Sequence, residues 1–160
     1  MCIDLIGQWN KNTTDDEAPV TSLALTIIAP ATSWFVISPL PNKESEIVAI
    51  TFDQQWLCKY PHPLQCIHDN GTEFVGMKFQ EMLASYGIQA VNTTVANPKA
   101  NAIIEHIHQV IANMLGTSNP ITDAAATQFH IEQQLHATQW AINTTYHTTL
   151  KALPAQLVFG

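Results

Sequence analysis

Residues 66–74 read CIHDNGTEF, and the fold of the whole chain can be inferred outward from this stretch. A short apolar run ends at His68, a carboxylate follows at Asp69, and Asn70 and Gly71 come next. An acid before Asn-Gly commonly forms a turn, and for Asp69 alone this structural role is the more common one. The end of a strand is also where α/β proteins place functional side chains. Other features of the sequence are needed to choose between these two interpretations.

The composition indicates one globular domain with an acidic surface. The chain has 160 residues, of which 46% are hydrophobic, enough to build one core. It contains six Lys, no Arg and thirteen acidic residues, so its net charge is -7. Affinity for phosphate backbones comes mainly from Lys and Arg, so a nucleic-acid function has to overcome this charge or depend on basic partners. The three Cys are unevenly spaced, without C-x-x-C, which favours a reduced, intracellular protein, nuclear or cytoplasmic rather than secreted.

Apolar periodicity predicts the element order β-β-β-α-β-α-β-α-α. The expected loops and linkers are residues 7–19, 92–101 and 117–126. A charge-free stretch at residues 20–38 contains Pro30 and many β-branched residues, so a β-hairpin is expected there and not a membrane-spanning helix. The order predicts an α/β fold with a mixed five-stranded sheet flanked by helices. Strands are expected at residues 1–6, 23–28, 34–38, 64–68 and 88–92, and helices at 44–57, 75–86 (ended by Gly87), 103–114 and around 131–146.

Two further carboxylates are candidates for the same site as Asp69. Asp4 lies within the first predicted strand, where an acid is costly unless it is paired or binds a cation. Glu105 follows Ile103 by two residues, about 200° around a helix, so it points away from the apolar stripe and can reach a site beside the sheet. Alone, Glu105 would more often complement the helix dipole, and Asp4 is evenly balanced between the two roles. The combination of the three acids predicts a site.

Two motifs resemble the catalytic core of retroviral and gypsy-type retrotransposon integrases. They are HDNGTEF at residues 68–74 and NPKANAIIEHIH at residues 97–108. Thirty-five residues, 70–104, separate Asp69 from Glu105, which is the interval that names the Asp-Asp-Glu signature of this family. The stretches IDLIGQW at 3–9, PATSWF at 30–35 and NTTYHTTLKALPAQLVFG at 143–160 add to the likeness. The resemblance covers essentially residues 1–160, as a single integrase core domain.

The resemblance implies a ribonuclease H-like fold in which Asp4, Asp69 and Glu105 are the catalytic residues and the ligands of two Mg²⁺ or Mn²⁺ ions. Three carboxylates in one crevice repel each other, and divalent cations compensate that repulsion. Two ions about 4 Å apart can activate an attacking oxygen and stabilise the leaving oxygen. The implied reactions are 3′-end processing and strand transfer by phosphodiester transesterification. The residues expected to contact the DNA are Asn70, Lys99 and Asn101.

The same resemblance implies partners and a longer protein. The expected partners are the DNA of the element ends and of the target, and further copies of the chain in a homo-oligomer, with no membrane. The zinc-binding domain and the C-terminal domain that flank the core in this family do not occur in the sequence, so a fragment of a longer polyprotein is expected. A zinc site within the core is not expected, because His68, His106 and His108 form no closed four-ligand pattern.

A second hypothesis is a catalytically inert or decayed integrase-derived domain that acts only as a protein-interaction module. The family usually has Arg at several positions that here hold His62, Gln65 and His106. The acidity and the absence of Arg favour this alternative, whereas the three retained acids favour the enzyme. A related nuclease of the same fold fits the 35-residue interval less well.

Overall fold

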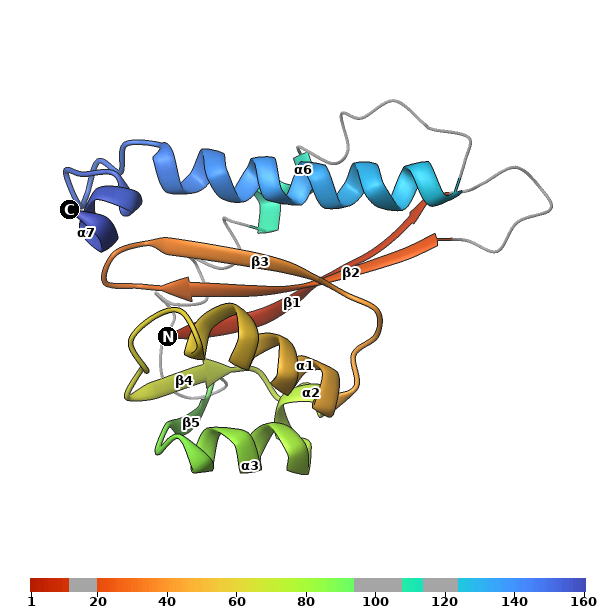
Figure 1. The fold of residues 1–160 in the computed structure, drawn as a ribbon, viewed down its shortest axis with the longest axis vertical. Coiled ribbons are helices and arrows are strands. Elements are labelled where there is room, and N and C mark those ends of the chain that lie inside the picture. The colour runs from red at the N-terminus through yellow and green to blue at the C-terminus, as the bar shows by residue number, and fades with distance from the viewer. Residues whose placement is uncertain (12–19, 94–107, 114–123) are drawn as a thin grey trace.

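The computed structural model describes residues 1–11, 20–93, 108–113 and 124–160, and within them a five-stranded sheet is covered by helices on both faces (Figure 1). Neighbouring strands β3, β2 and β1 pair antiparallel, while β4 runs parallel to both β1 and β5. The predicted mixed five-stranded sheet is confirmed. Its strands are β1 (Cys2–Lys11), β2 (Val20–Ala29), β3 (Trp34–Leu40), β4 (Gln65–His68) and β5 (Gln89–Asn92), in the spatial order β3-β2-β1-β4-β5.

The helices form two layers. Figure 1 shows α6 (Ala124–Thr144) running along one side of the sheet, with α1 (Ser45–Phe52) and α3 (Met77–Ser85) on the other. Residues 108–113 are helical as well, and the remainder of the helix predicted at 103–114 lies outside the described residues. No described helix is both long and apolar enough to span a membrane. The shorter elements are the π-helix η1 (Asp53–Leu57), α2 (Thr72–Val75) and α7 (Pro154–Phe159).

Each face of the sheet has its own apolar core. Successive side chains of a strand point to opposite faces, so in β1 Ile3 contributes to one core and Cys2 and Ile6 to the other. We call the first the α1–α3 core and the second the α6 core. The α1–α3 core includes Phe52, Phe74, Phe79 and Leu83, and the α6 core includes Phe35, Ile111, Ile131 and Leu135.

Side chains from α6 close the free edge of the sheet at β3. The Asn143 side chain accepts a hydrogen bond from the Phe35 N–H (2.9 Å) and donates one to the Phe35 carbonyl (2.7 Å). Gln139 accepts a third from the Ile37 N–H (2.8 Å). An edge strand otherwise presents unpaired backbone groups to other chains. The amides of α6 therefore complete the hydrogen bonding of β3 within the molecule.

The end of α3 has the glycine geometry that the sequence predicts. Gly87 has φ +68°, its N–H bonds the Ala84 carbonyl (3.0 Å), and the Ile88 N–H bonds the Leu83 carbonyl (2.9 Å). This pair of bonds is the Schellman motif, in which a left-handed residue ends the helix. The chain then enters β5 two residues after the turn.

Several predicted boundaries are wrong. Residues 7–11 belong to β1 and not to a loop, because β1 continues its ladder with β2 past a bulge between Gly7 and Trp9. Gly7 has φ +139°, which only glycine adopts readily, and so permits the bulge. The helix predicted at 75–86 is split at Gly76, and α7 was not expected. The linker predicted at 117–126 is helical from Ala124, and its first part lies outside the described residues.

Candidate functional site

Asp4 and Asp69 reach the same edge of the sheet from two neighbouring strands. The parallel strands β1 and β4 are in register at Cys2 and Ile67, and each aspartate lies two residues further along its chain. Carboxyl ends of parallel strands meet at one edge. The negative charge of Asp69 contributes to the raised pKa of Asp4, which agrees with the neighbouring positions that the strand register gives the two residues.

Asp4 carries a carboxylate that its surroundings stabilise poorly. Burial is the main reason why the pKa of Asp4 rises from 3.8 to about 6, and the charges of Asp69 and Glu73 raise it further. A hydrogen bond from the Leu5 N–H to Oδ1 (2.8 Å) lowers the pKa but does not offset these effects. The side chain is 29% exposed. An ionised Asp4 is therefore costly, and a cation bound beside it would remove this cost.

His108 connects the 108–113 helix to Asp4. Its Nδ1 lies 3.9 Å from Oδ2 of Asp4, and its Nε2 lies 3.3 Å from the Thr26 hydroxyl. The same hydroxyl donates to the main-chain oxygen of Asp4 (2.9 Å), so it accepts from His108. In the sequence His108 follows Glu105 by three residues. Glu105 itself lies outside the described residues, as do Lys99 and Asn101.

A tight turn orients Asp69. The Gly71 N–H donates to Oδ1 of Asp69 (2.8 Å), and Nδ1 of His68 lies 2.7 Å from the Asp69 carbonyl oxygen. Gly71 also allows a close approach of two acids, because a Cβ added there would lie 2.6 Å from Oε1 of Glu73 and 2.9 Å from Oδ1 of Asp69. Glu73 in the first turn of α2 is thus a further carboxylate beside the site. Glu73 is not among the residues predicted from the sequence, although its position directly after D-N-G-T could have indicated it.

Asn70 lies in the same turn, exposed to solvent. Its side-chain oxygen is hydrogen-bonded by Asn92 at the end of β5. The first part of β1 and the carboxyl ends of β4 and β5 therefore present polar side chains in the same region of the sheet.

The donor chemistry of this edge suits a hard divalent cation. Within the described ranges no three His, Cys, Asp or Glu side chains are grouped closely enough to hold a metal ion. Asp4 and Asp69 supply carboxylate oxygens, which Mg²⁺ and Mn²⁺ prefer, and the raised pKa of Asp4 indicates an unmet need for positive charge. His68 is buried in the α1–α3 core beside Phe74 and Phe79, which removes it from any zinc site with His108.

Comparison with known proteins gives one curated relative and many structural ones. No family model matches the sequence. The chain is 25% identical over 158 residues to the retrovirus-related Pol polyprotein from transposon 412 of Drosophila melanogaster. That match covers 99% of this chain but only 12% of the polyprotein.

Solved integrase structures share the fold at low sequence identity. The catalytic core domain of BIV integrase matches with a TM-score of 0.68, 15% identity, and coverage of 98% of this chain and 92% of that one. The HTLV-2 integrase catalytic core domain in complex with magnesium, in a trimeric form, matches with a TM-score of 0.70 and 15% identity. That match covers 98% of this chain and 93% of the HTLV-2 chain. A chain of the simian T-cell lymphotropic virus intasome in complex with PP2A regulatory subunit B56 gamma matches with a TM-score of 0.75 and 15% identity. That match covers 99% of this chain and 53% of the intasome chain.

Sequence and fold together support an integrase core domain. The structural neighbours are integrase catalytic cores, which have the ribonuclease H-like fold, so the predicted fold class is confirmed. In this integrase-like core, Asp4 is the third residue of β1, and Asp69 directly follows β4.

Proposed function

We propose that this integrase-like core is a metal-dependent polynucleotidyl transferase that performs 3′-end processing and strand transfer on DNA ends. The observation that carries the proposal is the pairing of Asp4 and Asp69 at one sheet edge, where burial and neighbouring acids raise the pKa of Asp4 to about 6. Binding of a cation to Asp4 would explain why an acid is kept at a position where its ionised form is unfavourable. The transposon polyprotein and the integrase cores are the relatives that support the reaction class.

Asp4, Asp69 and Glu105 would hold two Mg²⁺ or Mn²⁺ ions. When bound, such ions supply an activated oxygen nucleophile and stabilise the leaving oxygen of an in-line phosphoryl displacement. One structural neighbour is a core domain in complex with magnesium, which supports the choice of ion. His108 contacts Asp4 and follows Glu105 by three residues, and this supports Glu105 as the third ligand.

The protein prepares each carboxylate by fixing one of its oxygens. Oδ1 of Asp4 accepts from the Leu5 N–H, and Oδ1 of Asp69 accepts from the Gly71 N–H. Rigid backbone donors thus orient both side chains before a ligand arrives, which reduces the reorganisation needed on binding. The second oxygen of Asp69 accepts no hydrogen bond from a residue in the described ranges, whereas that of Asp4 lies 3.9 Å from Nδ1 of His108, and both oxygens would face the ligand.

DNA and further copies of the chain are the proposed partners. Asn70 is exposed at the site edge and would contact the DNA end together with Lys99 and Asn101. With a net charge of -7, the chain needs positive charge from elsewhere to hold a polyanion. The curated relative is a polyprotein of which this chain spans 12%, and the neighbours include an intasome and a trimeric core. We therefore propose that the core acts as an oligomer, within a longer polyprotein that supplies basic segments.

The second candidate is an inert descendant that serves only protein interaction. The absence of Arg from the whole sequence favours it, because DNA-binding domains depend on Arg and Lys for phosphate contacts. This candidate predicts a folded domain without metal binding or DNA chemistry.

A disintegration assay tests the proposal, because its DNA substrate mimics the strand-transfer product and asks only for the reverse chemistry. The wild type, Asp69→Asn and Glu105→Gln would be incubated with Mg²⁺ or Mn²⁺. Glu81→Gln is the matched control, since Glu81 is an exposed acid of α3 paired with Lys78 at 3.9 Å. We expect product from the wild type and the control only. Product from Glu105→Gln would show that Glu105 is not a ligand, and no product from any protein would favour the inert descendant.

A further inference from the structure

We propose that His68 is a positioning residue for Asp69: the buried imidazole holds the Asp69 main-chain carbonyl and thereby fixes the turn that aims the carboxylate. The inference rests on the proposed function, because it assigns Asp69 a ligand role. It goes beyond that function because it gives a residue buried in the α1–α3 core a role in orienting a ligand of the site.

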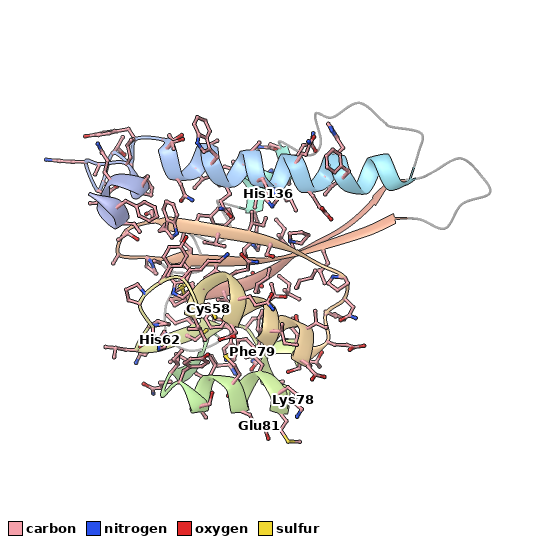
Figure 2. The ribbon with its side chains drawn as sticks, viewed as in Figure 1. Cys58, His62, Lys78, Phe79, Glu81 and His136 are labelled. Carbon is pink, nitrogen blue, oxygen red and sulfur yellow. The ribbon has the colours of Figure 1, made fainter. Side chains whose placement is uncertain are left out.

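The His68 ring is immobilised by aromatic packing. The residue ends β4 and is 2% exposed. Its ring lies 5.6 Å from that of Phe74 at an interplanar angle of 32°, and 6.1 Å from that of Phe79 at 85°. Figure 2 shows Phe79 on the side of α3 that faces α1, while its neighbour Lys78 points outward. An imidazole enclosed in this way has no room to change its orientation.

The hydrogen bonds of the ring define one neutral tautomer. The Asp69 carbonyl oxygen can only accept, so Nδ1, which lies 2.7 Å from it, carries the hydrogen. Nε2 is then an acceptor, and the side-chain nitrogen of Gln80 lies 3.5 Å from it as a donor. The same Gln80 nitrogen donates to the Phe74 carbonyl (2.7 Å) at the end of α2. Both ring nitrogens thus lie within hydrogen-bonding distance of a partner.

The contact between Nδ1 of His68 and the Asp69 carbonyl oxygen holds the main chain of Asp69. The Asp69 carbonyl belongs to the peptide unit that links Asp69 to Asn70, and the Gly71 N–H, which donates to Oδ1 of Asp69, belongs to the next unit. With the carbonyl held by His68, only the φ and ψ of Asn70 set the direction of the Gly71 N–H, so the contact restricts the turn that orients the carboxylate. Asp69 is therefore held at two points, main chain and side chain, and its other carboxylate oxygen has a defined direction.

A packing role alone does not account for a histidine at this position. A phenylalanine would fill the same aromatic cluster without burying two polar nitrogens, and a buried polar group is costly unless its hydrogen bonds are made. The bonds that His68 makes lead to Asp69 on one side and to the α2–α3 junction on the other. The first of them is the contact that would matter to a ligand at the sheet edge.

Two substitutions separate positioning from packing. His68→Phe keeps the ring but removes the donor, and His68→Asn removes the ring but keeps an amide N–H near the place of Nδ1. Val48→Ala is the control, because Val48 is fully buried in the same core but belongs to α1 and makes no ring contact or hydrogen bond with His68 among the described residues. Two readouts would be measured: hydrogen exchange of the Gly71 amide without metal, and the Mg²⁺ or Mn²⁺ concentration at the midpoint of the thermal shift.

We expect His68→Phe to speed Gly71 exchange by about tenfold relative to the α3 amides and to raise the metal midpoint by about 10- to 100-fold. His68→Asn should stay within about threefold of the wild type in both readouts, although it lowers the melting temperature. Val48→Ala should lower the melting temperature and leave both readouts unchanged. Such a pattern would separate orientation of Asp69 from core stability.

The inference is overturned if His68→Phe keeps Gly71 protection and the metal midpoint while losing only stability. Should His68→Phe fail to fold, His68→Asn decides: a midpoint like that of the wild type supports the inference, and one as high as that of Asp69→Asn overturns it. If the wild type shows no metal-dependent shift, the proposed function fails instead. The Gly71 exchange needs no metal and would still test the positioning by His68.

Discussion

Replacing Asp4 by Asn should stabilise the metal-free protein at neutral pH. Asparagine has the size of aspartate and keeps an oxygen that can accept from the Leu5 N–H, so the substitution removes the charge and little else. In the folded protein the pKa of Asp4 is about 6, against 3.8 for an unperturbed group. The folded state therefore binds this proton more tightly than the unfolded state, and the wild type loses stability as the pH rises from about 4 to about 6.

The size of the effect follows from that interval. At about 1.4 kcal/mol per pKa unit, the step from 3.8 to about 6 corresponds to at most about 3 kcal/mol. The side chain is 29% exposed, so water screens part of this cost, and we expect a gain of about 1–2 kcal/mol at pH 8. For a chain of this size that is a rise in melting temperature of about 3–6 °C. Near pH 4 the gain should be small, since Asp4 is then largely protonated in the folded state and carries little charge for the substitution to remove.

Thermal unfolding followed by circular dichroism, in EDTA from pH 4 to pH 8, measures the gain as the difference between variant and wild type at each pH. Glu81→Gln removes the same charge from an exposed pair and should shift stability by less than about 0.5 kcal/mol. Addition of Mg²⁺ should stabilise the wild type and leave Asp4→Asn unchanged, which reduces or reverses the difference. A variant that is less stable than the wild type at pH 8 in EDTA would refute the electrostatic account of Asp4.

Three further substitutions test other parts of the structure. Asn143→Leu leaves the N–H and carbonyl of Phe35 without partners at a buried edge, so urea unfolding should show a loss of about 2–4 kcal/mol, and a loss under about 0.5 kcal/mol would contradict the edge role of α6. Gly87→Ala should cost about 1 kcal/mol in thermal unfolding, entirely from its φ of +68°, because nothing lies within 4 Å of the added Cβ; Gly87→Asn should cost less. Gly71→Ala forces its Cβ to within 2.6 Å of Glu73 and 2.9 Å of Asp69 and should raise the Mg²⁺ midpoint by about tenfold; an unchanged midpoint would show that the turn does not set the geometry of the acids.

Regular elements with a clear apolar period could be predicted from the sequence. The core stripes of α3 and α6 and the continuous apolar runs of β2 and β3, which contribute to both cores, reflect burial, which local sequence records directly. The extension of β1 through residues 7–11 could not be predicted in this way. Its polar sequence resembles a loop, and only pairing with β2 makes it a strand. Likewise α7 has a short apolar sequence whose helix depends on packing against β3 and α6.

For the site, the strand ends were predictable and the contacts were not. Asp69 follows the apolar run of β4, so its place at the carboxyl end of a strand could be expected from the sequence, whereas Asp4 lies within β1 and comes near it through the parallel pairing of β1 with β4. The approach of Glu73 to Asp69 depends on the missing Cβ of Gly71 and on the turn between β4 and α2. The role of His68 depends on a tautomer set by two partners, one of them twelve residues away at Gln80. Such information is three-dimensional and leaves no periodic signal.

The cost of ionised Asp4 also bears on the choice between an enzyme and an inert descendant. A domain used only for protein interaction gains nothing from a partly buried acid whose pKa is raised to about 6, and one substitution to Asn would remove the free-energy cost of ionising it. Buried polar groups such as Asn143 and His68 are hydrogen-bonded, to the edge of β3 and to Asp69 respectively. Asp4 differs from them because it is an acid whose ionised form is made unfavourable by burial and by the neighbouring acids. Local departures of this kind are expected at functional sites, and a divalent cation bound beside Asp4 and Asp69 would offset the cost of the ionised form.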